Sequence, residues 1–132
     1  MAKQDYIKQN REWLEVKSAE PGVRHIGRNI FCKVISSGRP NGKTPGRNSV
    51  VVVHYTGTTV NGKKFDSSRG GAPVALRLRD LIQGWIIALQ QMRQGDRWEI
   101  YIPAEMGYGR FSQPGIPGGS TLIFDIELID VL

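Results

Sequence analysis

One stretch of the later two-thirds of the chain, residues 80–92, has the periodicity of a helix, and segments that alternate like strands surround it. Its apolar side chains gather on one stripe of a 3.6-residue period: Leu81, Ile82, Trp85, Ile86, Leu89 and Met92. We expect Asp80 to be the N-cap and Gly95 to follow the helix as a stop signal. Gly84 lowers helix stability by roughly 1 kcal/mol relative to Ala, which suggests that another backbone approaches it closely.

Trp85 is the most informative residue of this helix. A tryptophan in the first turns of a short helix between strands is either a filler of the core or the floor of an apolar pocket. The helix pattern alone favours the core.

Alternating apolar residues predict strands on both sides of the helix. The predicted strands cover residues 29–36, 50–60, 63–67, 73–78, 97–102 and 121–131. The Asn61-Gly62 pair is a strong signal for a tight hairpin between the second and third of them. The apolar stripe of the helix then packs on one face of a curved antiparallel sheet, so the predicted fold class is α+β.

Residues 5–16 predict a further helix, which Pro21-Gly22 ends, and residues 37–49 predict a solvated loop. The apolar stripe of this N-terminal helix is imperfect. Two arrangements are therefore open: the helix packs on the domain, or it projects and forms a homodimer with a second copy.

Length and composition exclude several classes of protein. A chain of 132 residues is expected to form one domain, and it has no run of about 18 apolar residues that could span a membrane. The first ten residues lack an apolar segment typical of a signal peptide, so we expect a cytoplasmic protein, with a mature periplasmic form as the alternative. One cysteine, Cys32, and two histidines, His25 and His54, predict no disulfide, no metal and no cofactor.

The net charge of +6 resides in the N-terminal third. Residues 1–50 hold ten Lys or Arg and four Asp or Glu, whereas residues 51–132 hold eight of each kind. This excess is compatible with an acidic partner or nucleic acid, but a solvated surface is the simpler interpretation. No basic stretch is interleaved with aromatic residues, so nucleic-acid binding is not expected.

The segment 103–120 predicts a long loop with five glycines and three prolines. Loops of this length in a small domain are often functional. This one also carries apolar groups that a linker does not need: Met106, Tyr108, Phe111 and Ile116.

No motif for nucleophilic, phosphate-binding or metal chemistry is present. Asp66 lies between an aromatic residue and two serines near the hairpin, where a carboxylate is more often a turn acceptor than a catalyst. A set of aromatic residues lies beside the glycine- and proline-rich loops: Tyr55, Phe65, Trp85, Tyr108 and Phe124. They are either core residues or the walls of a pocket at the edges of the predicted elements.

Linked motifs in residues 50–132 form a specific series. They are Val51-x-Val-His-Tyr-Thr-Gly57, Gly62-x-x-Phe65-Asp66-Ser67-Ser68, Leu81-Ile82-x-Gly84-Trp85, Ile102-Pro103 with Gly107-Tyr108-Gly109, Pro114-Gly115-Ile116-Pro117, and residues 121–128. In order and spacing this series resembles the FKBP-type peptidyl-prolyl cis-trans isomerases. Residues 1–49 match less specifically, and a helix ahead of the domain resembles bacterial members of the macrophage-infectivity-potentiator type. The resemblance implies a division into 1–49, holding the N-terminal helix, first strand and loop, and an isomerase core over 50–132, within one globular domain.

The resemblance implies a half-barrel sheet wrapped around the helix, an isomerase activity (EC 5.2.1.8 type) on proline-containing polypeptides, and possible macrolide ligands. It implies that Trp85 is the floor of the substrate pocket and that Asp66 orients groups around the twisting amide. The implied walls are Tyr55, Phe65, Leu81, Ile82, Tyr108, Ile116 and Phe124. The Ile82 N–H and the Tyr108 hydroxyl would donate hydrogen bonds to substrate carbonyls.

The sequence departs from the family pattern at several points that concern macrolide affinity. Val74 stands where the family often has a large aromatic, Gln113 stands where it often has histidine, and the loops after Asp66 and Ile116 are shorter. Arg69 is a candidate for the arginine that would pair with Asp66. Two alternatives to an isomerase remain: a non-catalytic module that holds proline segments, and a basic adaptor for nucleic acid.

Overall fold

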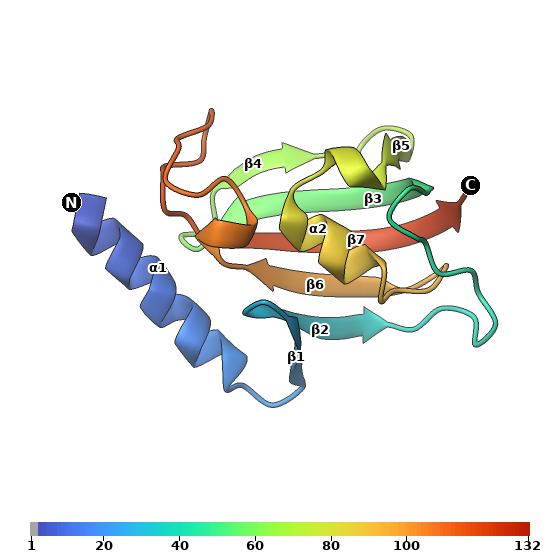
Figure 1. Ribbon diagram of the computed structural model, residues 1–132, viewed down its shortest axis with the longest axis horizontal. Helices are drawn as coiled ribbons and strands as arrows, with labels where there is room; N and C mark the ends of the chain where they lie inside the picture. The colour runs from blue at the N-terminus through green and yellow to red at the C-terminus, as the bar shows by residue number, and fades with distance from the viewer. Residues whose placement is uncertain (1–2) are drawn as a thin grey trace.

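Seven strands form one antiparallel sheet in the computed structural model, which describes residues 3–132. The strands are β1 (Val23–Gly27), β2 (Ile30–Ser36), β3 (Val50–Thr59), β4 (Lys64–Ser67), β5 (Val74–Arg77), β6 (Arg97–Ile102) and β7 (Leu122–Val131). Their spatial order is β1-β2-β6-β7-β3-β4, with β5 paired to the other end of β3. The sheet lies behind one short helix, with a longer helix at one end (Figure 1). The predicted α+β class is confirmed.

The helix on the sheet is shorter than the sequence predicts. A 3₁₀ turn, η1 (Leu78–Asp80), comes first, and α2 (Gln83–Leu89) follows with Ile82 as its N-cap. The prediction that Asp80 caps the helix is therefore wrong. The apolar period extends beyond α2 because the flanking turns also bury apolar side chains. Met92, which follows α2, is 0% exposed. Gly84 does permit a close approach, but of the Ile102 side chain rather than a backbone, since a Cβ would lie 2.6 Å from it.

The N-terminal helix α1 (Lys3–Ser18) packs on the domain, burying Asn10 and Leu14. Asn10 is 1% exposed, and its side-chain oxygen accepts a hydrogen bond from the Thr121 N–H at 2.8 Å. The Tyr6 hydroxyl shares a 2.6 Å hydrogen bond with the Ser120 hydroxyl. These bonds join α1 to the residues just before β7.

Strand β1 is an element that sequence analysis misses. It pairs with β2 at the edge of the sheet through a two-residue turn at Arg28 and Asn29, both of which have positive φ. Its residues Arg24 and His25 are exposed, so the strand lacks the alternation of a half-buried one.

The core lies between α2 and the sheet. Trp85, Ile86 and Leu89 of α2 pack with buried residues of the central strands, including Ile100 and Ile126. Cys32 is fully buried in this core, and burial raises the pKa of its thiol. Among residues 3–132, no helix has both the length and the apolar character needed to cross a membrane.

Candidate functional site

A cavity of about 270 Å³ opens between α2 and the sheet. It is lined by Tyr55, Phe65, Asp66, Leu76, Asp80, Leu81, Ile82, Trp85, Tyr108 and Phe124. These residues come from β3, β4, β5, the η1–α2 segment, the 103–120 loop and β7. The site therefore depends on the whole sheet and on the position of α2.

Edge-to-face aromatic contacts build the wall of this cavity. The Trp85 ring lies 5.2 Å from the Tyr55 ring and 5.4 Å from the Phe124 ring, at interplanar angles of 85° in both pairs. Phe65 contacts Phe124 in the same way, at 5.6 Å and 89°. Such pairs stabilise by roughly 0.5–1.5 kcal/mol beyond the area they bury. Trp85 is 4% exposed, so it lies at the base of an open aromatic pocket.

Gly57 of β3 lies directly beneath two of these rings. A Cβ at this position would lie 2.6 Å from the Phe65 ring and 2.7 Å from the Phe124 ring. Both distances are shorter than ordinary van der Waals contact, so the two rings need glycine here. The sequence places Gly57 in a family motif, but its packing role becomes visible only in three dimensions.

The Tyr55 phenol donates a 2.6 Å hydrogen bond to Oδ2 of Asp66. Burial, this hydrogen bond and the charge of Asp66 raise the pKa of Tyr55 to about 12. Burial and the charge of Asp66 also raise the pKa of Tyr108. Both phenols are therefore protonated donors at neutral pH, around an exposed carboxylate.

Two hydrogen-bond donors at the cavity have no protein acceptor among residues 3–132. The Leu81 N–H donates to the Leu78 carbonyl, whereas the next amide, the Ile82 N–H, has no acceptor in this part of the chain. The Tyr108 hydroxyl likewise has none, and its side chain is 36% exposed. A bound ligand with carbonyl groups can accept from both.

The structure gathers eight of the nine site residues that the sequence singles out. Ile116 is buried in the core, is absent from the lining, and stays a prediction as a substrate contact. Leu76 and Asp80 line the cavity although sequence analysis assigns them no part in it. The alternation of residues 73–78 is a signal for Leu76, whereas the sequence predicts only a helix cap for Asp80.

Arg69 does not pair with Asp66. Its guanidinium lies 3.2 Å from a carboxylate oxygen of Glu127 and 4.0 Å from one of Asp125, both on β7. In the part of the chain that the structure describes, the side-chain hydrogen bond to Asp66 comes from the Tyr55 hydroxyl and not from a cation. No group of three or more metal-ligating side chains is found in that part either.

Comparison with known proteins decides the family. Residues 41–129 match the family described as FKBP-type peptidyl-prolyl cis-trans isomerase. The chain belongs to this family.

Similar proteins include both longer chains and a chain of comparable length. FKBP-type peptidyl-prolyl cis-trans isomerase FkpA of Escherichia coli K12 is 38% identical over 122 residues, which are 92% of this chain and 44% of that protein. Outer membrane protein MIP of Legionella longbeachae is 38% identical over 121 residues, 90% of this chain and 51% of that protein. This chain thus spans about half the length of these relatives. A crystal structure of a peptidyl-prolyl cis-trans isomerase from Pseudomonas syringae superposes with a TM-score of 0.91 at 33% identity, covering 99% of this chain and 96% of that one.

Proposed function

We propose that the chain accelerates rotation about X–Pro bonds of polypeptides in the aromatic cavity. The observation that carries this proposal is an apolar pocket based on Trp85, with two unused donors, the Ile82 N–H and the Tyr108 hydroxyl, at its edge. The family membership of the chain supports it.

The geometry suits this reaction because rotation needs no nucleophile. Resonance holds the X–Pro bond planar behind a barrier of about 18–20 kcal/mol. The twisted amide has lost resonance and much of its charge separation, so an apolar site disfavours the planar form more than the twisted one. Each ~1.4 kcal/mol of that preference accelerates rotation about tenfold.

Each residue then has a role in holding the substrate. Trp85 supports the proline ring, and Tyr55, Phe65, Leu81, Ile82 and Phe124 surround it. The Ile82 N–H and the Tyr108 hydroxyl bind carbonyls on either side of the rotating bond. Asp66, held by Tyr55, orients the groups around the twisting amide.

A protease-coupled assay on a short X–Pro peptide tests the proposal. Trp85→Ala and Asp66→Ala are expected to lose most of the acceleration. Trp13→Ala and Asp5→Ala are matched controls on α1, far from the cavity in sequence and absent from its lining, and should retain it. Failure of the unmodified protein to accelerate the reaction contradicts the proposal.

The alternative, a module that holds proline segments without catalysis, predicts a different pattern. Suppression of client aggregation would then persist in Trp85→Ala and Asp66→Ala. Binding of proline peptides without acceleration would favour this function over the isomerase.

Macrolides are a further ligand class, and we propose that they bind this cavity weakly. Its volume of about 270 Å³ lies just below the usual range of ligand pockets, roughly 300–1,000 Å³. Val74, where the family often has a large aromatic, is partly buried against the core and contributes no side chain to the cavity lining. Val74→Phe is expected to tighten macrolide binding in a calorimetric titration, and an unchanged affinity contradicts this account.

The cytoplasmic location that the sequence predicts stays a prediction. One relative is named an outer membrane protein, which supports the alternative of a mature form in the periplasm. Cell fractionation with an antibody against the protein distinguishes the two locations. Self-association through α1 also stays a prediction.

A further inference from the structure

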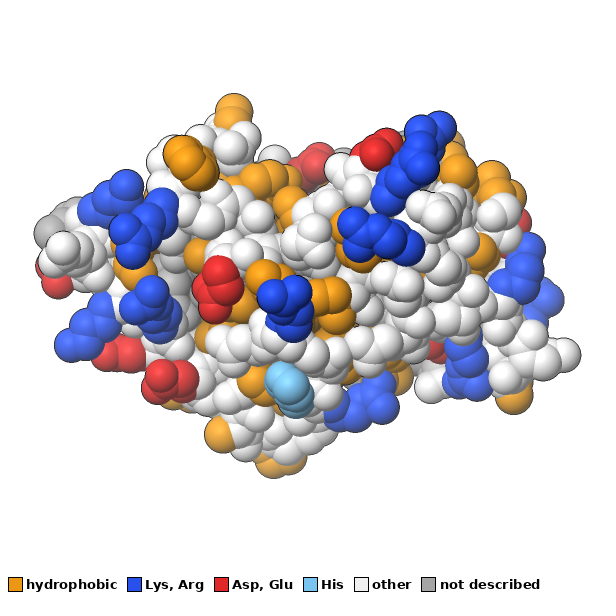
Figure 2. Space-filling model, in the orientation of Figure 1, with side chains coloured by type: hydrophobic (Ala, Val, Ile, Leu, Met, Phe, Trp, Pro, Cys, Tyr) orange, Lys and Arg blue, Asp and Glu red, His pale blue; other side chains and the backbone are white. Residues whose placement is uncertain are grey.

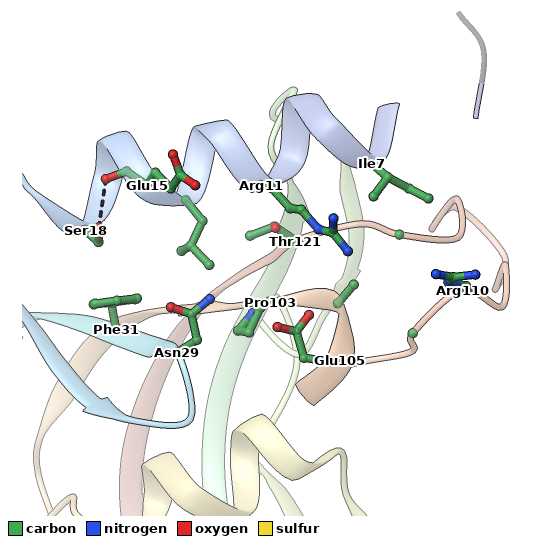
Figure 3. Close-up of a pocket in the computed structure, with 14 residues that line it drawn as sticks. Ile7, Arg11, Glu15, Ser18, Asn29, Phe31, Pro103, Glu105, Arg110 and Thr121 are labelled. Carbon is green, nitrogen blue, oxygen red and sulfur yellow. Dashed lines mark hydrogen bonds between the residues drawn. The ribbon is translucent and has the colours of Figure 1, made fainter. Parts of the chain in front are cut away.

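A second cavity, of about 450 Å³, lies between α1 and the 103–120 loop, apart from the aromatic site. Figure 3 shows Arg11 reaching from α1 toward this loop, with Pro103 and Glu105 on the opposite wall. An adjoining hollow of about 400 Å³ shares Ile7, Arg11 and Arg110 with it. We call the two together the helix groove.

The walls of the helix groove are fixed in place. The Asn10–Thr121 and Tyr6–Ser120 hydrogen bonds hold α1 at a set distance from the chain before β7. A Cβ built at Gly119, where φ is +85°, would overlap Ile7, so the helix and the loop are in close contact at this end. The groove is therefore a formed site rather than a gap left by a loosely attached helix.

Two guanidinium groups face the helix groove without an ionic partner. Within residues 3–132, neither Arg11 nor Arg110 has a carboxylate oxygen within 4.0 Å, although Glu15 and Glu105 line the same cavity. Lys3 and Lys8 line the adjoining hollow, and Lys8 has only an exposed pair with Glu12 at 3.8 Å. Figure 2 shows Lys and Arg side chains gathered at the end of the molecule where α1 begins.

The groove also offers apolar contacts between these charges. Ile7, Leu14, Phe31 and Pro103 contribute to its walls. A guanidinium fork binds a carboxylate through two parallel hydrogen bonds, and its charge is weakly hydrated. Glu15 and Glu105 would repel a continuous polyanion, whereas a chain with spaced carboxylates can place them at Arg11 and Arg110.

We propose that the helix groove binds an acidic, extended segment of a polypeptide. Its carboxylates pair with Arg11 and Arg110, and an apolar side chain between them packs on Ile7 and Pro103. This site goes beyond the proposed isomerase function, because it includes neither Trp85 nor Asp66 and its occupation requires no proline.

Fluorescence anisotropy with the full chain tests the proposal. The probe is a labelled extended peptide without proline, in which glutamates alternate with leucines, and its comparison is the same peptide with glutamine in place of glutamate. We expect the acidic peptide to bind at low salt and to weaken as salt rises, because the charges are exposed. Arg11→Gln with Arg110→Gln should weaken it at least tenfold.

The matched control removes the same charge elsewhere. Lys33→Gln with Arg47→Gln also lowers the net charge by two, at exposed residues outside the groove, and should leave the affinity unchanged. Thermal unfolding of both double variants verifies that they are folded, and Arg11→Lys with Arg110→Lys should retain part of the binding.

Three results would overturn the proposal. They are equal binding of the glutamine peptide, equal loss in the matched control, and an unchanged affinity in Arg11→Gln with Arg110→Gln. A different occupant is also tested. If the unmodified protein binds no peptide and sediments as a dimer, and Arg11→Gln with Arg110→Gln sediments as a monomer, the groove binds a second copy of the chain instead. Because the probe lacks proline, failure of this proposal leaves the isomerase proposal untouched.

Discussion

At the aromatic pocket, the hydrogen bond from Tyr55 fixes the position of Asp66, one of the two carboxylates that line the cavity. Asp66 is exposed, so without this bond its side chain would be free to rotate. The phenol therefore acts on the site through the carboxylate as well as through its ring.

Ionisation of Tyr55 links this bond to stability. Its pKa is about 12 in the folded chain and near 10 in the unfolded chain, so the unfolded chain loses its proton first. The stabilisation is thus complete below pH 10 and is lost as pH rises toward 12. We expect Tyr55→Phe to lower the free energy of unfolding by about 1 kcal/mol at neutral pH.

Urea unfolding over a series of pH values measures this effect. The difference between the parent and Tyr55→Phe should shrink between pH 10 and 12, since the variant lacks the ionising phenol. A difference that stays constant across this interval would show that neither burial nor the bond to Asp66 shifts the ionisation of Tyr55 on folding. Tyr6→Phe, which removes a phenol on α1, is the control for a general loss of hydroxyl groups.

Sequence reasoning singles out both Tyr55 and Asp66 but not the bond between them. The two lie eleven positions apart, and the register of β3 and β4 brings them together. Ile116 is the opposite case. A sequence motif marks it as a substrate contact, but the burial of its side chain depends on how the 103–120 loop folds.

Among the elements, the β1–β2 hairpin depends on an unfavourable turn. Arg28 and Asn29 have φ values of 48° and 61°, in the left-handed region that costs most residues roughly 1–2 kcal/mol. Turns with two such residues prefer Asn-Gly. We expect Arg28→Asn with Asn29→Gly to raise the free energy of unfolding by about 0.5–1 kcal/mol.

Denaturant unfolding checks this prediction, with Arg28→Ala as the control. Alanine retains the steric cost of positive φ, so it should bring no gain. If the Asn-Gly variant is no more stable than the alanine variant, the turn is not strained as described.

A buried amide contributes to the docking of α1. Asn10 accepts from the Thr121 N–H and donates to the Tyr6 carbonyl at 2.8 Å. Asn10→Ala leaves the Thr121 N–H buried without an acceptor, which costs roughly 1–3 kcal/mol. The amide of Thr121 should then exchange its hydrogen faster, whereas Gln9→Ala, at an exposed position of the same helix, should change neither stability nor exchange.

Sequence periodicity predicts elements well where one face is buried and poorly elsewhere. It gives β6 its bounds, Arg97–Ile102, because three apolar residues alternate there with polar ones. It extends α2 at both ends because the flanking turns, which partly bury Leu81 and fully bury Met92, carry the same apolar period. It misses β1, whose edge position leaves Arg24 and His25 exposed.

For the whole molecule, the order of strands in the sheet is the feature that no local pattern contains. β2 lies beside β6, and β3 lies between β7 and β4, so the late strands β6 and β7 separate β2 from β3, which follow one another in the sequence. The division into 1–49 and 50–132 follows the family motifs but crosses this pairing, since residues 1–49 supply β1 and β2. We therefore propose that the chain unfolds as one cooperative unit, with α1 included.

The three tryptophans are natural probes of this cooperativity because each reports on a different layer. Trp13 lies on α1, 5.9 Å from the Tyr101 ring; Trp85 lies on α2; and Trp98 lies on β6. In three variants that each retain one tryptophan, with phenylalanine at the other two positions, fluorescence and circular dichroism should give the same urea midpoint within each variant. An earlier fluorescence midpoint for the variant that retains Trp13 would mean that α1 detaches before the sheet unfolds. In that case the helix groove would open and close in the native protein, and its affinity for acidic peptides would depend on the docking energy of α1.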